Sequence, residues 1–217
     1  MRGKIVGLVV ILFAVMGGIG FYVMSQNKTS PSNSDFTPKL LSRLGGMDCY
    51  TFNETVIVTY SNITITSTLT GGFYNGTYFF HGKKNGTEWW TVISGGELIQ
   101  RVLINGSSKI IEFNITQDQR SLMTIYDPVK LALRAVGAGK EISRKRNSGE
   151  YHYTIRLTEK ELMCGNLTVW VDKNFYPVKI VSNGVTFREG NRTVVLSIRA
   201  NVFNKCVIPS WVKELKS

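Results

Sequence analysis

The chain has 217 residues and a formal net charge of +11 at pH 7, which allows one sizeable domain with additional segments. Its three cysteines, Cys49, Cys164 and Cys206, form no C-x-x-C pair, and its two histidines, His81 and His152, are isolated in the sequence. This spacing argues against a zinc site, and no G-x-S-x-G or H-E-x-x-H motif indicates a catalytic centre. We therefore expect no enzyme, no catalytic residue, no metal and no cofactor.

An uncharged run of 20 residues, Ile5–Met24, follows two basic residues, Arg2 and Lys4. About 20 apolar residues are needed for a helix to cross the hydrocarbon core of a bilayer. A cleaved signal peptide, the alternative, has a shorter apolar region and a small-x-small exit, and neither is clear here. Because basic residues favour the cytoplasmic side, we expect residues 1–24 to be an uncleaved, single-pass signal-anchor in the cell membrane with a cytoplasmic N-terminus.

Residues 25–37 are rich in Ser, Asn and Thr and predict a polar linker, which leaves residues 38–217 as an extracytoplasmic domain. Nine of the 15 asparagines lie in Asn-x-Ser/Thr sequons, far more than the Ser and Thr content gives by chance. Such sequons accept N-linked glycans, so they favour an extracellular glycoprotein. The acceptor residues are Asn27, Asn53, Asn62, Asn75, Asn85, Asn105, Asn114, Asn166 and Asn191.

Apolar and polar residues alternate through most of this domain, which is the pattern of half-buried strands. Asn-Gly pairs at 75–76, 85–86, 105–106 and 183–184 predict tight turns between them. Because so many twisted strands curl rather than lie flat, the sequence predicts an α+β, mainly β fold: a strongly curved antiparallel half-barrel of about ten strands with a few covering helices. The predicted strands are 50–60, 62–69, 73–80, 86–93, 97–104, 109–115, 150–158, 166–173, 176–182 and 193–203.

Three short segments predict the helices that cover this sheet. The first has Thr37 as its N-cap and ends at Gly45, and the second has Asp127 as its N-cap and ends at Gly137. Residues 209–217 predict a short closing helix. These helices are few for so many strands, which favours an interior that is not fully covered.

The sequons also predict the outer face of each strand, because a glycan cannot point into a core. Asn53, Asn62, Asn114 and Asn166 each lie on the polar face, so the sugar pattern and the hydrophobic pattern agree on one apolar inward face. That face is either a solid core under the helices or a cavity for an apolar ligand. Its predicted residues are Phe52, Val56, Val58, Ile63, Ile65, Leu69, Ile111, Phe113, Ile115, Leu167, Val169 and Val171.

The segment "NLTVWVDKNFYPVKI", residues 166–180, resembles a hairpin of the LolA-like and LppX-like lipoprotein carrier superfamily. "DPVKLALRAV" resembles the helix between the sheet halves of those proteins, and "LLSRLGGMDCYTF" resembles their opening helix and first strand. The resemblance implies a half-barrel, lidded by helices, that holds acyl chains in an apolar cavity and carries lipoproteins or lipids without being an enzyme. This chain departs from the family in its anchor and its load of sequons.

Basic residues cluster between residues 140 and 146 and predict a loop that contacts anionic lipid headgroups, at about 1 kcal/mol for each charge near the surface. The alternative is a solvated loop. The predicted contacts are Lys140, Arg144, Lys145 and Arg146.

The three cysteines predict one disulfide. In a meander of ten strands the first strand begins and the last strand ends at the same edge, so we expect a Cys49–Cys206 bond with Cys164 free.

Together these features predict a membrane-anchored extracytoplasmic protein that binds lipid or another hydrophobic ligand, with a carrier-like role and no nucleic-acid partner. The alternative is a structural surface module, such as a pilin-like subunit or an adhesin, with a solid core and no ligand. A continuous apolar cavity would separate the two hypotheses.

Overall fold

The structure is a computed structural model that describes residues 36–60, 63–84, 86–117, 120, 126–147, 149–159, 163–189 and 192–216. The predicted anchor, residues 1–24, and residues 25–35 of the predicted linker lie outside this part of the chain. Within it, none of the helices has the length and hydrophobicity of a membrane span.

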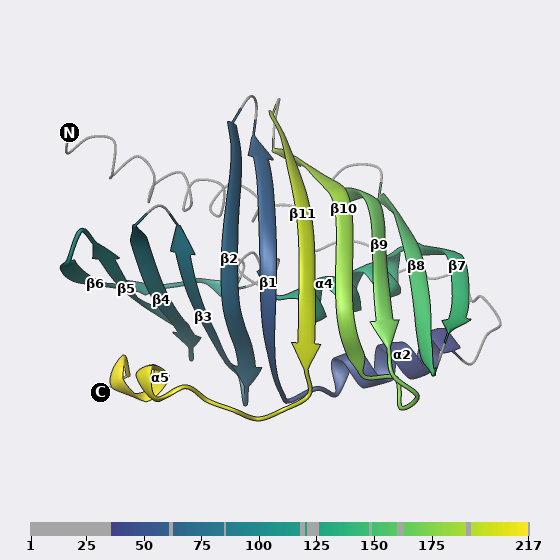
Figure 1. The fold of residues 1–217 in the computed structure, drawn as a ribbon, viewed down its shortest axis with the longest axis horizontal. Helices are drawn as coiled ribbons and strands as arrows, with labels where there is room; N and C mark the ends of the chain where they lie inside the picture. Colours follow the sequence, from purple (N-terminus) through teal and green to yellow (C-terminus); the bar gives the residue numbers. More distant parts are fainter. Residues whose placement is uncertain are drawn as a thin grey trace.

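The described residues form one curved antiparallel sheet of eleven strands, in the spatial order β6-β5-β4-β3-β2-β1-β11-β10-β9-β8-β7 (Figure 1). Two meanders, β1–β6 and β7–β11, therefore meet at a central seam where β1 pairs with β11. The strands are β1 Cys49–Tyr60, β2 Ile63–Tyr74, β3 Thr77–Lys84, β4 Thr87–Ser94, β5 Glu97–Ile104, β6 Ser107–Asn114, β7 Lys140–Asn147, β8 Glu150–Glu159, β9 Met163–Val171, β10 Pro177–Glu189 and β11 Arg192–Phe203.

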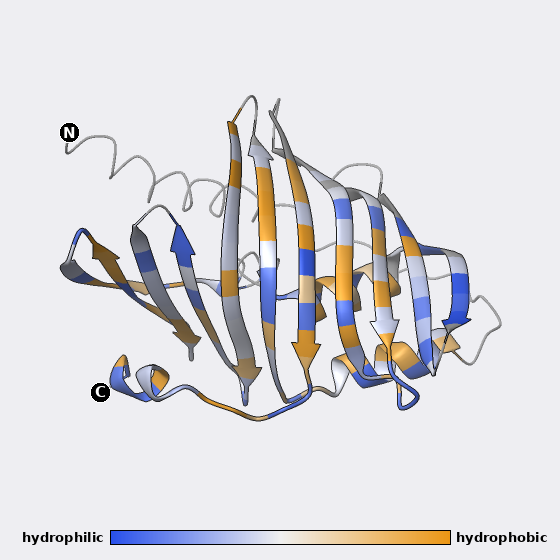
Figure 2. Cartoon of the chain, in the orientation of Figure 1, coloured by the Kyte–Doolittle hydropathy of each residue, from blue (hydrophilic) through white to orange (hydrophobic). Residues whose placement is uncertain are grey.

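The eleventh strand corrects the prediction of ten. Residues 140–147, which the sequence predicted as a basic loop, form the edge strand β7 paired with β8. Charged residues are typical of edge strands because they oppose pairing with another chain. Figure 2 shows β7 as mainly hydrophilic, whereas the central strands alternate between hydrophilic and hydrophobic residues.

Two of the predicted Asn-Gly turns are confirmed. Asn75 and Asn105 have positive φ values of 43° and 49°, as two-residue hairpin turns require. The predicted turn at 183–184 is wrong, because it lies inside β10 at a register shift between Ser182 and Val185, which is a β-bulge.

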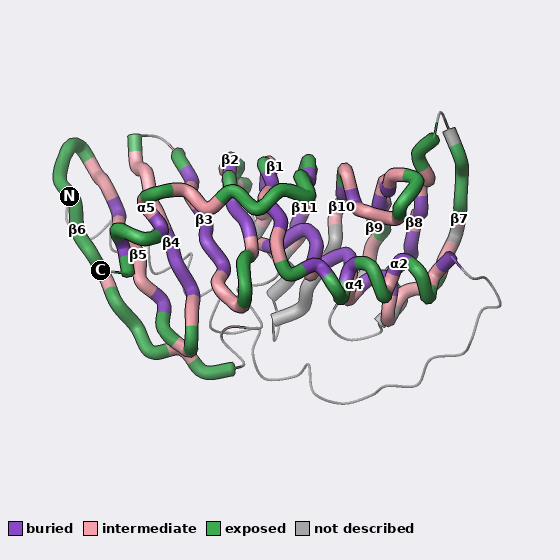
Figure 3. Tube along the Cα trace, turned by 90° about the horizontal axis from the view of Figure 1, so that it is seen from below, coloured by how far each residue is buried: buried purple, intermediate pink, exposed green. Residues whose placement is uncertain are grey.

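Three helices accompany the sheet in the described residues: α2 Phe36–Gly45, α4 Pro128–Ala138 and α5 Ser210–Glu214. Helix α4 packs on β8–β11 and α2 packs on α4, so both lie on the concave side at this half of the arc (Figure 3). Asp127 caps α4 as predicted, since its carboxylate accepts from the N–H groups of Val129 and Lys130. The helix ends at Ala138 rather than at Gly137. Thr37 is not an N-cap, because α2 already begins at Phe36, and its hydroxyl instead hydrogen-bonds the Tyr153 hydroxyl at 2.9 Å.

The two faces of the sheet carry separate cores. The concave core joins both meanders with α2 and α4. A smaller cluster on the convex face packs Val212 and Leu215, in and just after α5, against Phe79 of β3 and Val92 of β4. Strands β3 and β4 are therefore covered on both faces, which explains why their sequence is apolar over several consecutive residues.

Candidate functional site

The concave face is built from registered rungs that cross the whole sheet. One rung runs from Tyr153 on β8 through Val169, Ile180 and Ala200 to Glu54 on β1, and it continues on the other side through Leu69, Gly82, Trp89 and Val102. Residues of one rung share a face because side chains alternate along a strand. This rung places a carboxyl group in the middle of an apolar surface.

Half of the predicted cavity residues are packed in the concave core. Six of them are 8% exposed or less, and they belong to one continuous cluster with the helices. These residues are Phe52, Val56, Leu69, Leu167, Val169 and Val171. They occupy the predicted face, but in the described residues they pack against protein.

The other six predicted cavity residues are partly or largely exposed. Ile63 and Phe113 are 56% and 42% exposed, and the remaining four are half-buried. Phe113 lies opposite the buried Leu98 on β5, so it belongs to the concave face at the β6 edge. The half-buried residues are Val58, Ile65, Ile111 and Ile115. Among the described residues, the concave face is therefore least covered at the β6 edge, at residues 111–115.

The prediction that this face is wholly apolar is wrong. Thr91 is 4% exposed, and its hydroxyl accepts a hydrogen bond from the Gln100 amide at 2.9 Å. Ser182 is fully buried at the β10 bulge, where its hydroxyl accepts from the Ile198 N–H at 3.0 Å. These polar groups satisfy one another or the backbone, as buried polar groups must.

Two buried acids lie beneath the seam. Asp127 accepts a hydrogen bond from the Tyr50 hydroxyl, and burial raises its pKa to about 6 against the opposing effects of that bond and of the α4 N–H groups. Glu54 is 4% exposed, and neither carboxyl oxygen has a hydrogen-bond partner among the described residues. Burial, with a smaller contribution from the Asp127 charge, holds the pKa of Glu54 well above its ordinary value. This burial disfavours the charged carboxylate, since an unpaired buried charge costs far more than a neutral group.

Two cationic side chains lie over aromatic rings on the concave face of β2 and β3. The Arg120 guanidinium donates to the Gly76 carbonyl at 2.5 Å and lies 5.8 Å from the centre of the Tyr78 ring. The Lys130 ammonium lies 4.6 Å from the centre of the Phe73 ring. The alternation in the sequence does not predict these contacts, because Arg120 and Lys130 lie outside the strands.

The predicted headgroup residues are divided between two faces. Arg144 and Arg146 lie opposite Tyr153 and Tyr151 on the concave side of β7, and Arg144 also donates to Glu141 at 2.7 Å. Lys140 and Lys145 lie opposite Arg156 and His152 on the other side. All four are exposed, but β7 does not present them as one patch.

The sequons within the described residues agree with the predicted outer face. All five acceptors are exposed, two in turns and three on the convex face of a strand. They are Asn53, Asn75, Asn105, Asn114 and Asn166. The side chains of the remaining four, Asn27, Asn62, Asn85 and Asn191, lie outside the described residues. Glycosylation itself stays a prediction.

The Cys49–Cys206 disulfide is confirmed, with 5.4 Å between the two Cα atoms. It closes the seam, because Cys49 begins β1 and Cys206 follows the end of its neighbour β11. Cys164 lies near the start of β9, which runs parallel to β11 and so begins at the opposite end of the sheet.

Fold and site together define an open, strongly curved antiparallel sheet with helical cover over one half of its concave face. No family model matches the chain, and no curated protein matches it. Several solved structures do match over most of its length.

One of these structures is a LolA superfamily protein from Nitrosomonas europaea, with 10% identity and a TM-score of 0.36 over 84% of this chain and 97% of that one. Another is a DUF1329 family protein from Desulfovibrio piger, with 9% identity and a TM-score of 0.34 over 82% and 97% of the two chains. A third is the MucA/MucB complex of Pseudomonas aeruginosa, with 12% identity and a TM-score of 0.33 over 82% and 60%. The matches include the superfamily that the sequence resembles, but at this similarity they transfer no ligand or partner.

Proposed function

We propose that the chain is a membrane-anchored extracytoplasmic protein that binds lipid or another apolar ligand at the concave face along β4–β6. The observation that carries this proposal is the unequal cover of one apolar surface. Helices α4 and α2 pack over β8–β11, whereas Phe113 at the β6 edge is 42% exposed on the same face. Exposed apolar residues continuous with a core are typical of ligand grooves.

We also propose that residues 1–24 anchor the domain in the membrane and that the ligand site lies outside the cytoplasm. The support for this is the apolar run behind Arg2 and Lys4 together with the exposed sequons. A carrier-like role would follow if the ligand can leave the groove, which the open β6 edge favours.

The alternative is a structural surface module with a solid core. One observation favours it: Phe52, Leu167 and Val169 are 1% exposed or less, so the middle of the concave face is filled with protein side chains. A module of this kind would hold no ligand at the β6 edge either.

Photolabelling of the full chain in nanodiscs separates the two. A fatty acid that carries a diazirine is expected to label peptides of β4–β6 in the binding protein, and labelling of residues 1–24 reports that the probe is present. Phe113→Asp should reduce the β4–β6 labelling severalfold, because a charge on the concave face repels an apolar chain.

Ile110→Asp is the matched control. Ile110 lies on the same strand, is 56% exposed and faces the convex side opposite Arg101. Labelling confined to residues 1–24, or lost equally in both variants, would contradict ligand binding and favour the surface module.

A further inference from the structure

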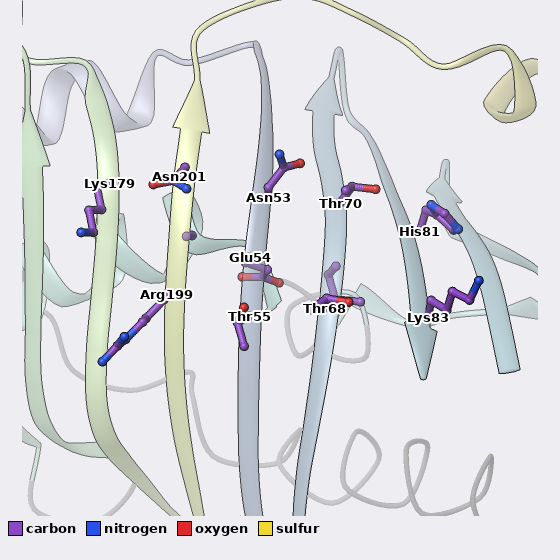
Figure 4. Close-up of a pocket in the computed structure, with 12 residues that line it drawn as sticks. Asn53, Glu54, Thr55, Thr68, Thr70, His81, Lys83, Lys179, Arg199 and Asn201 are labelled. Carbon is purple, nitrogen blue, oxygen red and sulfur yellow. The ribbon is translucent and has the colours of Figure 1, made fainter. Parts of the chain in front are cut away.

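A groove of about 500 Å³ crosses the convex face, on the side of the sheet opposite the proposed ligand site. Five adjacent strands, β3, β2, β1, β11 and β10, form its floor. Figure 4 shows two cationic ends with short polar side chains between them. The groove spans the central seam, so its residues come from both meanders.

The first rung of the groove reads Lys83, Thr68, Thr55 and Arg199, each opposite the next on neighbouring strands. Three strand spacings separate the two cations, about 14 Å at the usual spacing between strands. Lys83, Thr68 and Arg199 are exposed. The hydroxyl groups therefore lie between two positive charges and can reach solvent.

The second rung reads His81, Thr70, Asn53, Asn201 and Lys179. Four strand spacings separate His81 from Lys179, about 19 Å. The three residues between them offer one hydroxyl and two amides, and all three are exposed. Amides and hydroxyls can both donate and accept hydrogen bonds, so this floor suits a ligand that does the same.

The charges in the groove are mostly not neutralised by the protein. No ion pair to an acidic side chain is formed by Lys83, Lys179 or Arg199 within the described residues. Among the described residues, Glu54 lines the groove only from the concave side of β1, and Glu88 lies beside it on β4, opposite Lys83, with its carboxylate 2.7 Å from the His81 ring nitrogen. Lys179 also lies 5.2 Å from the centre of the Trp170 ring, which holds this cation at the end of the groove.

We propose that this groove binds an acidic oligosaccharide, a chain of sugars bearing carboxylate or sulfate groups. The cations Lys83 and Arg199, on strands about 14 Å apart, match two separated negative charges, and the floor of hydroxyls and amides matches the sugar hydroxyls between them. An acidic peptide would meet the same charges, but it has few hydroxyl groups for the five threonine and asparagine side chains of the two rungs. This site is on the opposite face from the proposed lipid site and does not depend on it.

A flat membrane surface fits this groove less well than a linear chain does. Trp211 and Val212 of α5 pack against Phe79, one rung beyond His81, so the helix stands above the sheet beside the β3 end of the groove. A planar surface would meet α5 before it met the threonines. An extended oligosaccharide can lie across the strands beside the helix.

The predicted glycan at Asn53 and this ligand exclude each other, because Asn53 lies in the middle of the floor. An unmodified Asn53 leaves the groove open, whereas a glycan there fills it. Mass spectrometry of the native protein therefore forms part of the test. Full occupancy of Asn53 would overturn the proposal and make the groove the site of the chain's own glycan.

Binding is measured by calorimetry on the full chain in zwitterionic nanodiscs. The probes are hexagalacturonate, a heparin-derived hexasaccharide, neutral maltohexaose and hexaglutamate. At least one of the two acidic hexasaccharides should bind more tightly than the other two probes. The double variant Lys179→Gln/Arg199→Gln should weaken that binding by about tenfold, since it removes two exposed charge-assisted hydrogen bonds whose strength the solvent screens.

The charge-matched control is Lys109→Gln/Lys205→Gln, because both lysines are exposed and lie outside the groove. It should leave the affinity unchanged. Three results would overturn the proposal. The first is that maltohexaose binds as tightly as the acidic hexasaccharides, and the second is that hexaglutamate binds as tightly and loses as much affinity in the groove variant. The third is that anionic-lipid nanodiscs bind the chain through the same residues.

Discussion

The two meanders bury their concave faces in different ways. In β9 and β10 most inward residues are aliphatic, and with β8 they lie under α4, so Ile155, Leu167 and Ile180 are 1% exposed or less. In β1–β6, the inward face is rich in aromatic residues and opens at Phe113. One half is thus a conventional sheet-and-helix core, whereas among the described residues the other half has less helical cover.

Glycines lie opposite aromatic residues in β1–β4. Gly71 pairs with Phe52 across β1 and β2, and a Cβ atom at Gly71 would lie 2.6 Å from the Phe52 ring. Gly82 pairs in the same way with Trp89 across β3 and β4. A ring can lie flat over a strand where the opposite residue has no side chain. These two glycines therefore let aromatic rings pack closely on the concave face of β1–β4.

The disulfide at the seam holds these two halves together, and its removal should have the largest effect. The bond closes a loop of 157 residues, so the chain-entropy model gives a loss of about 4–5 kcal/mol in the free energy of unfolding for Cys206→Ser. Urea denaturation measures it. Cys164→Ser is the control, and a comparable loss there would contradict the expectation that Cys164 is free.

Core truncation should separate the halves directly. Leu167→Ala in the covered half should cost about 2–5 kcal/mol, because the helices above it cannot collapse into the space. Phe113→Ala should cost less than about 1 kcal/mol, since a partly exposed side chain has already retained part of its contact with water. Chemical denaturation of both variants tests this, and equal losses would mean that the β6 edge is as firmly packed as β9.

The sequence predicted the covered half better than the open half. In β9 the sugar pattern and the hydrophobic pattern agree, and Leu167, Val169 and Val171 are all buried. The same argument at β6 places Phe113 on the correct face. The alternation of side chains predicts which face a residue occupies, but it does not predict what covers that face. The segment between β6 and α4 has no clear periodicity in its sequence, so it gives no prediction of what covers that face. The basic strand β7 was missed because lysine and arginine favour loops as strongly as edge strands.

The convex groove could not be predicted from local patterns. Its cations lie on β3, β10 and β11, and they share rungs only because β1 pairs with β11. Hydrophobic alternation does not specify which distant strands become neighbours. Glu54, by contrast, had a visible signal, because it interrupts the apolar face of 50–60. An acid at an inward position indicates either a partner or a raised pKa, and the structure gives the second.

Glu54 supplies the smallest expected effect, at the boundary between the halves. Burial raises the pKa of Glu54 in the folded protein above the ordinary value of 4.5. At pH values between the ordinary pKa and the raised pKa, the folded protein binds more protons than the unfolded chain. The free energy of unfolding should therefore fall as the pH rises through this range. Asp127 contributes in the same direction, between 3.8 and about 6.

Glu54→Leu removes the buried carboxyl and keeps an apolar side chain in its place. It should raise the free energy of unfolding by about 1 kcal/mol at pH 8 and change it little at pH 5, because the acid is neutral in the folded protein at the lower pH. Urea titrations at both pH values measure the difference, with the exposed Glu112→Gln of β6 as the control. If Glu54→Leu instead lost stability at pH 8, the carboxylate would be charged and paired, and the seam would then be held together by a buried ionic contact rather than by a neutral acid in an apolar surface.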